Sequence, residues 1–114
     1  MFKRRKGNAG EQKAAAFLKK EGYQIIEKNY RTPFGEIDII ALQNETLVFI
    51  EVKSRSSRQF GTGAESVDRR KQYKIIKSAQ VYIKKFYQHE QKCRFDVISI
   101  DSGKISHIKN AFTL

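Results

Sequence analysis

Two short apolar segments, residues 36–42 and 46–53, most constrain what this 114-residue chain can fold into. Both are rich in β-branched residues, and only the polar residues 43–45 separate them, which predicts two antiparallel strands joined by a tight hairpin. Apolar side chains occur at alternate positions on both faces of this hairpin. Other parts of the chain must therefore cover the predicted sheet from both sides.

The remainder of the chain predicts the elements that provide this cover. In chain order we expect a helix from Asn8 to Gly22, strands over residues 23–30, 36–42 and 46–53, a helix over 65–89, and strands over 93–100 and 104–108. The order α-β-β-β-α-β-β predicts an α/β fold, in which a mixed central sheet lies between helices as a three-layer α/β/α sandwich.

Length and composition predict one soluble domain. With 114 residues, of which 39% are hydrophobic, we expect a single domain over residues 1–114 and a flexible basic end at residues 1–7. This end is interpreted as a solvated tail, with a nuclear-type signal or a nucleic-acid arm as the alternatives. The single cysteine cannot form an internal disulfide, and no apolar run approaches the length of a membrane span. We therefore expect a cytoplasmic protein without a membrane partner.

The excess of positive charge indicates a polyanionic partner. Lys and Arg number 23 against 12 Asp and Glu, which leaves a formal net charge of +11 at pH 7. Part of this charge recurs at helical spacing on the long predicted helix, nearly opposite its apolar stripe, at Arg70, Lys74, Lys77 and Lys84. Nucleic acid is the first candidate partner.

Charged residues cluster at one end of the predicted hairpin. A turn centred on residues 44–45 pairs Asp38 with Glu51. The same register pairs Glu36 with Lys53, and the period of two places these charged side chains on one face. The opposite face is expected to carry Ile37, Ile39, Val48, Ile50 and Val52.

Three carboxylates and one ammonium group leave this cluster with a net negative charge. A hard divalent cation with oxygen ligands would neutralise it, and Mg²⁺ is the natural candidate. The alternative, given equal weight on spacing alone, is a solvated network of ion pairs at the end of the sheet.

Two polar residues fall on the apolar faces of the predicted helices. Glu11 shares a face with Ala14, Ala15 and Leu18, which places an acid toward the sheet. Its alternative role is that of a first-turn glutamate favoured by the helix dipole. Gln72 likewise falls on the apolar face of the second helix, where an amide alone indicates little.

A set of motifs, taken in order, resembles the YraN family, whose function is uncharacterised. The set consists of Gly10-Glu11, the run from Gly35 to Asp38, the run from Phe49 to Lys53, Arg55, Phe60-Gly61, Lys71, and the run from Arg94 to Asp96. Over nearly the whole chain, this family resembles the PD-(D/E)xK nuclease superfamily, closest to its Holliday-junction-resolvase and RecB-type branch. The resemblance implies a restriction-endonuclease-like fold. One departure is that Ile37, and not proline, precedes Asp38.

The resemblance also implies roles for the clustered residues. Asp38 and Glu51 would be metal ligands, Lys53 would position or activate the attacking water, and Glu11 would be an additional acid. The implied activity is Mg²⁺-dependent hydrolysis of phosphodiester bonds in DNA, with Mn²⁺ as a substitute metal and branched or damaged DNA as candidate substrates. Similarity to junction resolvases further implies a homodimer.

Basic residues near the predicted site are expected to contact phosphates. The first candidates are Arg55, Arg58 and Lys71, followed by Arg69, Arg70, Lys74 and the basic run of residues 3–6. Two other functions compete with a nuclease. One is a catalytically silent nucleic-acid-binding or adaptor protein, and the other is an ion-pair scaffold that binds an acidic protein.

The remaining candidate residues receive structural interpretations. Arg94 and Asp96 alternate onto one face of a predicted strand and are expected to give structural support, with substrate contact as the alternative. His89 and His107 have no Cys or His partner at metal-ligand spacing, so both are expected at the surface. Cys93 lies in no nucleophile motif.

Overall fold

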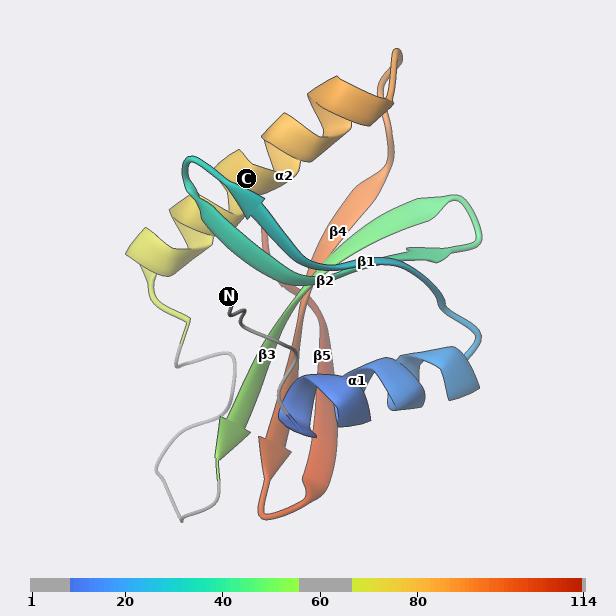
Figure 1. The fold of residues 1–114 in the computed structure, drawn as a ribbon, viewed down its shortest axis with the longest axis vertical. Helices are drawn as coiled ribbons and strands as arrows, with labels where there is room; N and C mark the ends of the chain where they lie inside the picture. The colour runs from blue at the N-terminus through green and yellow to red at the C-terminus, as the bar shows by residue number, and fades with distance from the viewer. Residues whose placement is uncertain (1–8, 56–66, 114) are drawn as a thin grey trace, which may run out of the picture.

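The computed structural model describes residues 9–55 and 67–113, which form an α/β fold of two helices and a five-stranded mixed sheet (Figure 1). The elements are α1 (Ala9–Lys20), β1 (Gln24–Thr32), β2 (Gly35–Gln43), β3 (Thr46–Arg55), α2 (Arg69–Phe86), β4 (Cys93–Asp101) and β5 (Lys104–Phe112). The predicted element order is confirmed. The predicted basic end at residues 1–7 lies outside the described residues.

The strands lie in the sheet in the order in which they occur in the chain, from β1 to β5. Only β3 and β4 are parallel, because α2 connects them as a crossover, and the other neighbours are antiparallel. The central strand β3 is buried on both faces, and its residues Leu47, Val48, Phe49 and Ile50 are fully buried.

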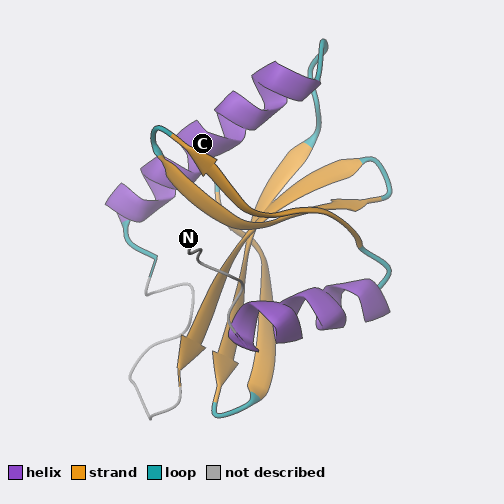
Figure 2. Cartoon of the chain, viewed as in Figure 1, coloured by secondary structure: helices purple, strands orange, loops and turns teal. Residues whose placement is uncertain are grey.

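The two helices cover opposite faces of the sheet (Figure 2). Ala14 and Leu18 of α1 pack with one set of strand residues, which includes Val48. Ile75 and Ala79 of α2 pack with the alternate set, which includes Phe49. The predicted three-layer arrangement is confirmed at this level. No helix in residues 9–55 or 67–113 is long and apolar enough to cross a membrane.

The second helix begins later than predicted, because Asp68 caps it. The Asp68 carboxylate accepts a hydrogen bond of 2.9 Å from the backbone N–H of Lys71, so the helix begins at Arg69. It ends at Phe86, also short of the predicted end. Arg70, Lys74 and Lys84 are exposed and Lys77 is half-buried, so the basic face predicted from their spacing is confirmed for three of its four residues.

The β2–β3 hairpin has the predicted register but a shorter ladder. Gln43 pairs with Thr46 across the turn, where Asn44 adopts φ 54°. The ladder ends at the pair Ile39–Ile50. The expected pairs Asp38–Glu51 and Glu36–Lys53 are therefore not formed as backbone pairs, because the strands separate before reaching them.

The alternation of side chains also breaks where the strands separate. Ile37 packs on the α2 side and Ile39 on the α1 side, so the prediction that both share one face was wrong. Opposite this break, Asn29 of β1 adopts the left-handed φ of 54° between the pairs Lys28–Ile39 and Tyr30–Ile37. The break leaves Asp38 between the two faces of the sheet.

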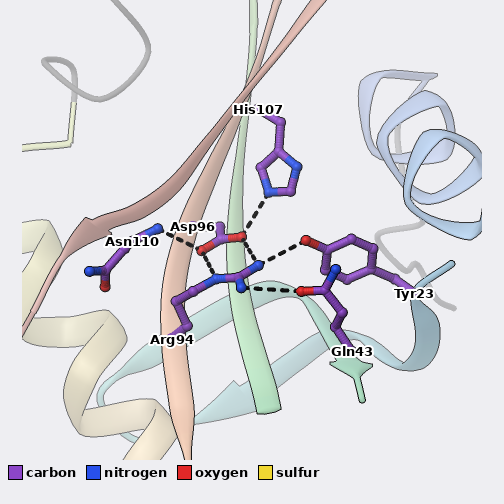
Figure 3. A network of polar contacts seen from close by, with 6 residues as sticks. All are labelled: Tyr23, Gln43, Arg94, Asp96, His107 and Asn110. Atoms are coloured by element: carbon purple, nitrogen blue, oxygen red, sulfur yellow. Dashed lines mark hydrogen bonds and ion pairs between the residues drawn. The ribbon is translucent and has the colours of Figure 1, made fainter. Parts of the chain in front are cut away.

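A buried polar network ties β4 to three neighbouring segments (Figure 3). Asp96 is fully buried, and its carboxylate accepts two hydrogen bonds of 2.8 Å from the guanidinium of Arg94. The backbone N–H of Asn110 on β5 donates to the same carboxylate at 2.9 Å. Arg94 also donates to Tyr23 Oη at 2.8 Å and to Gln43 Oε1 at 3.2 Å. The predicted structural role of Arg94 and Asp96 is supported by these contacts.

His107 belongs to this network, so its predicted surface position was wrong. Its side chain is 8% exposed, and its Nε2 lies 2.7 Å from Asp96 Oδ2. The ring packs against Phe17 and Tyr23, with centroids 6.0 and 5.8 Å away. The ring nitrogen of this histidine is paired with a carboxylate on the neighbouring strand. Spacing along the sequence could not indicate this contact.

Replacing Asp96 by Asn tests how much the network contributes to the free energy of unfolding. We expect Asp96→Asn to lower the free energy of unfolding at pH 7 by about 3–5 kcal/mol, because it leaves a partly buried guanidinium without its counter-charge. Urea unfolding measures the change. The exposed Glu90→Gln is the control, expected to stay within about 0.5 kcal/mol of the parent.

The same variant tests the pH dependence. Burial raises the pKa of Asp96, but hydrogen bonds from His107, Arg94 and the Asn110 N–H outweigh it and hold the pKa below its ordinary value of 3.8. A lowered carboxyl pKa stabilises the fold above the unfolded-state pKa and loses this effect as the pH falls through the folded-state pKa. The difference between parent and variant should shrink below about pH 4. A constant difference would contradict this assignment.

Candidate active site

The candidate active site lies where β2 and β3 separate. Asp38 is the first residue of β2 beyond the ladder, and its Oδ2 accepts a hydrogen bond of 2.8 Å from the backbone N–H of Val52. A side chain thus replaces the next backbone contact between the strands. In Figure 1 the β1–β2 end turns toward α2, whereas β3 continues in another direction.

Asp38 carries the most perturbed carboxyl group of the cluster. Burial, reinforced by the negative charge of Glu51, raises the pKa of Asp38 from 3.8 to about 7. The hydrogen bond from Val52 lowers it in part, and the charges of Glu11 and Glu36 raise it further. The four acids predicted from the sequence therefore share one electrostatic environment, and an added proton or cation at Asp38 relieves their repulsion.

Glu51 lies beside Asp38 and contacts two lysines. Its side chain is 5% exposed, and its Oε2 lies 3.1 Å from Lys71 Nζ and 3.8 Å from Lys53 Nζ. Burial lowers the pKa of Lys71, but the charge and hydrogen bond of Glu51 outweigh it, so the pKa is raised. Lys71, predicted to contact phosphate, therefore has a carboxylate partner inside the site.

Glu11 reaches the site from α1, on the other side of the sheet. It is 4% exposed, and its Oε1 accepts a hydrogen bond of 3.0 Å from Asn29 Nδ2. Asn29 was not among the predicted site residues. The one signal for it in the sequence is its type, since Asn tolerates the left-handed conformation better than most residues do.

Some predicted residues have other contacts than the sequence indicates. Gln72 donates from Nε2 to the backbone oxygen of Val67 at 2.9 Å, a contact within the segment that begins α2. Glu36 lies 4.0 Å from Arg31 on β1, and its predicted backbone pair with Lys53 is not formed, but its charge still acts on Asp38. Arg58 and the side chain of Arg55 lie outside the described part of the chain.

The donor set of the site fits a hard divalent cation held by few protein ligands. In the described ranges, no three Asp, Glu, His or Cys side chains are grouped closely enough to hold a metal ion by themselves. Asp38 and Glu51 offer two carboxylates, and Mg²⁺ commonly binds through one or two carboxylates together with water and substrate phosphate oxygens. The raised pKa of Asp38 is consistent with this fit, because desolvation and the charge of Glu51 both disfavour an unneutralised carboxylate there, and a bound cation would offset them.

The raised pKa of Asp38 should make the folded chain less stable at neutral and higher pH than at acid pH. A carboxyl pKa of about 7 in the folded state, against 3.8, means that stability is lost as the pH rises between these values. Asp38→Asn keeps an acceptor for the Val52 N–H but carries no charge. We expect it to exceed the parent in free energy of unfolding by at least about 1 kcal/mol near pH 8, with the difference vanishing near pH 4.

Carboxyl NMR titration provides the direct measurement. Asp38 should titrate near 7 in the parent and closer to its ordinary pKa in Glu51→Gln, since that substitution removes the nearest negative charge. An Asp38 titration at an ordinary carboxyl pKa in the parent would contradict the geometry described above.

Comparison with known proteins places the chain among relatives of similar length. Residues 10–100 match the model of the Uncharacterised protein family UPF0102. A UPF0102 protein of Persephonella marina is 50% identical over 114 residues, which cover 100% of this chain and 98% of the relative. A UPF0102 protein of Thermodesulfovibrio yellowstonii is 51% identical over 106 residues, 93% of this chain and 94% of the relative. The chain therefore belongs to the UPF0102 family, the YraN-like family that its motifs indicated.

Proposed function

We propose that this protein is a Mg²⁺-dependent nuclease that hydrolyses phosphodiester bonds of DNA, with a restriction-endonuclease-like fold of the PD-(D/E)xK type. One observation carries the proposal: the half-buried Asp38, with a pKa raised to about 7, lies beside the buried Glu51, and two lysines contact Glu51. Structural ion pairs normally match their charges. Here burial, reinforced by the negative charges of the neighbouring acids, raises a carboxyl pKa, which favours a functional interpretation.

The order of the elements supports the same conclusion. An acid on the first helix, an acid on a hairpin strand, and Glu51 and Lys53 on the next strand come together at one place from separate parts of the chain. The +11 net charge supports a polyanionic substrate.

Asp38 and Glu51 would hold the Mg²⁺ ion, which when bound supplies positive charge to the phosphate and makes water a stronger acid. The Lys53 side chain is 28% exposed and its Nζ lies 3.8 Å from Glu51, so it would orient a water molecule beside the carboxylates. Lys71 is 44% exposed, so the same ammonium group that holds Glu51 can meet a phosphate oxygen. Glu11, held by Asn29, adds negative charge near Asp38 and strengthens its affinity for a cation.

Cleavage of branched, linear and single-stranded DNA in Mg²⁺ or Mn²⁺ tests the proposal. Asp38→Asn and Glu51→Gln should each reduce the rate at least about 100-fold, because each removes a ligand to the group that stabilises charge in the transition state. Glu45→Gln, which removes an exposed acid from the β2–β3 turn, should leave the rate unchanged. Cleavage by Asp38→Asn at the parental rate would refute the assignment.

Mn²⁺ titration by calorimetry separates this proposal from the second candidate, a nucleic-acid-binding protein without turnover. That candidate is favoured by the contact of Lys71 with Glu51, which neutralises one acid without a metal. A stoichiometric Mn²⁺ site that is lost in both acid variants supports the nuclease. DNA binding that falls steeply with salt and is independent of metal, with no Mn²⁺ site, supports the binding protein.

A further inference from the structure

An aromatic and basic surface beside the site has no role in the proposed reaction. We call this surface the aromatic platform and define it by Phe34, Tyr73 and Lys77. Phe34, in the β1–β2 turn, is 43% exposed, and Tyr73, on α2, is 59% exposed. Lys77 Nζ lies 6.0 Å from the ring centroid of Phe34 and 5.6 Å from that of Tyr73. Large apolar groups gathered in the open around one cation are typical of an interaction site.

Hydrogen bonds and close packing hold the turn that carries Phe34 against α2. The hydroxyl oxygens of Thr32 and Ser78 are 2.7 Å apart, and Ser78 is fully buried. The backbone N–H of Phe34 donates to Thr32 Oγ1 at 3.0 Å. Gly35 has φ 148°, and a Cβ there would lie 3.8 Å from Lys74 Cβ, so turn and helix are in near contact. The backbone segments that carry the two rings are therefore held in a defined arrangement before any partner binds.

The charge around the platform selects an anionic partner. The 18 residues of α2 include two Arg and five Lys but no Asp or Glu. Arg70 precedes Tyr73 by one helical turn and Lys77 follows it by one, so these cations share its face of the helix. Exposed rings among cations match a partner that has both flat apolar groups and negative charges.

We propose that the aromatic platform binds unpaired nucleotides, with bases stacked on Tyr73 and Phe34 and phosphates neutralised by Lys77 and Arg70. In a nucleic acid, flat bases alternate with phosphates, and exposed bases of single strands stack on aromatic side chains. Duplex DNA hides the base faces, so it would use the cations but not the rings. This inference rests on the proposed function and specifies its substrate as nucleic acid with a single-stranded segment next to the cleaved bond.

The chain connects the platform directly to the candidate active site. Phe34 precedes Asp38 by four residues of nearly extended chain, a span of at most about 14 Å. Tyr73 follows Lys71 by two residues, and Lys71 Nζ lies 3.1 Å from Glu51. A strand held on the platform would thus have a phosphate near the acids within a few nucleotides.

A tryptophan reporter tests stacking directly, because the chain has no Trp. In EDTA, which prevents cleavage, a single-stranded thymidine oligonucleotide should quench the fluorescence of Tyr73→Trp, since a stacked base contacts the indole. Phe86→Trp is the matched control. Phe86 is 53% exposed on the same helix, and Lys85 Nζ lies 5.6 Å from its ring centroid. We expect no quenching there.

Affinity measurements by fluorescence anisotropy separate stacking from charge. Tyr73→Ala should weaken single-strand binding about 5- to 100-fold and keep the salt dependence, whereas Tyr73→Phe should retain parental affinity. Lys77→Ala should reduce the slope of log affinity against log salt by about 0.7. Circular dichroism melting of each variant verifies that it is folded.

Three outcomes for Tyr73→Ala would overturn the inference. The variant could bind single strands with parental affinity, or lose affinity for single strands and duplexes equally. It could also differ from the parent in oligomeric state, as measured by ultracentrifugation. The last would assign the platform to a contact between two copies of the chain. The inference and the proposed function fail separately. Cleavage that depends on Asp38 without stacking at Tyr73 rejects only the platform, and stacking without cleavage in any metal rejects only the nuclease.

Discussion

The hydrogen bond from the Val52 N–H to the Asp38 carboxylate is the contact on which the rest of the site depends. It occupies the point where the β2–β3 ladder ends, and it holds the two diverging strands together through a side chain. The divergence lets one carboxylate lie near Glu51 on one face of the sheet and near Glu11 on the other. A regular ladder would pair Asp38 with Glu51 on a single face and leave Glu11 apart on the other.

Two aspartates in this small domain, Asp96 and the half-buried Asp38, have opposite environments. Asp96 is fully buried, and a guanidinium, an imidazole and a backbone N–H hold its pKa below the ordinary value. For Asp38, burial and the charges of acidic neighbours raise the pKa to about 7, and its one backbone donor lowers the pKa only in part. The first arrangement stabilises the folded state and joins the strands. The arrangement around Asp38 opposes folding. Groups that destabilise the folded state in this way are typical of functional sites.

Helix α2 serves both the core and the candidate interface. One face packs Ile75, Ala79 and Tyr82 against the sheet. Its first turn brings Lys71 to Glu51, and its outer face carries Tyr73 and the cations. Because Asp68 caps the helix and the Thr32–Ser78 contact joins it to the β1–β2 turn, the acids and the exposed rings keep a fixed relation. The proposed contact of one nucleic acid with both depends on this fixed relation.

The sequence by itself determined the element order, the hairpin register and the amphipathic helices, because these follow from periodicities between near neighbours. It also indicated the cluster of Glu11, Asp38, Glu51 and Lys53 through motif resemblance. Tertiary structure decided what depends on contacts between distant segments. The break of alternation opposite Asn29, the partnership of His107 with Asp96 and the contact of Lys71 with Glu51 all arise in this way. They share one physical reason. A buried charged or polar group needs a partner close to it in space, and that partner can come from a strand or helix distant in the sequence, which local spacing does not indicate.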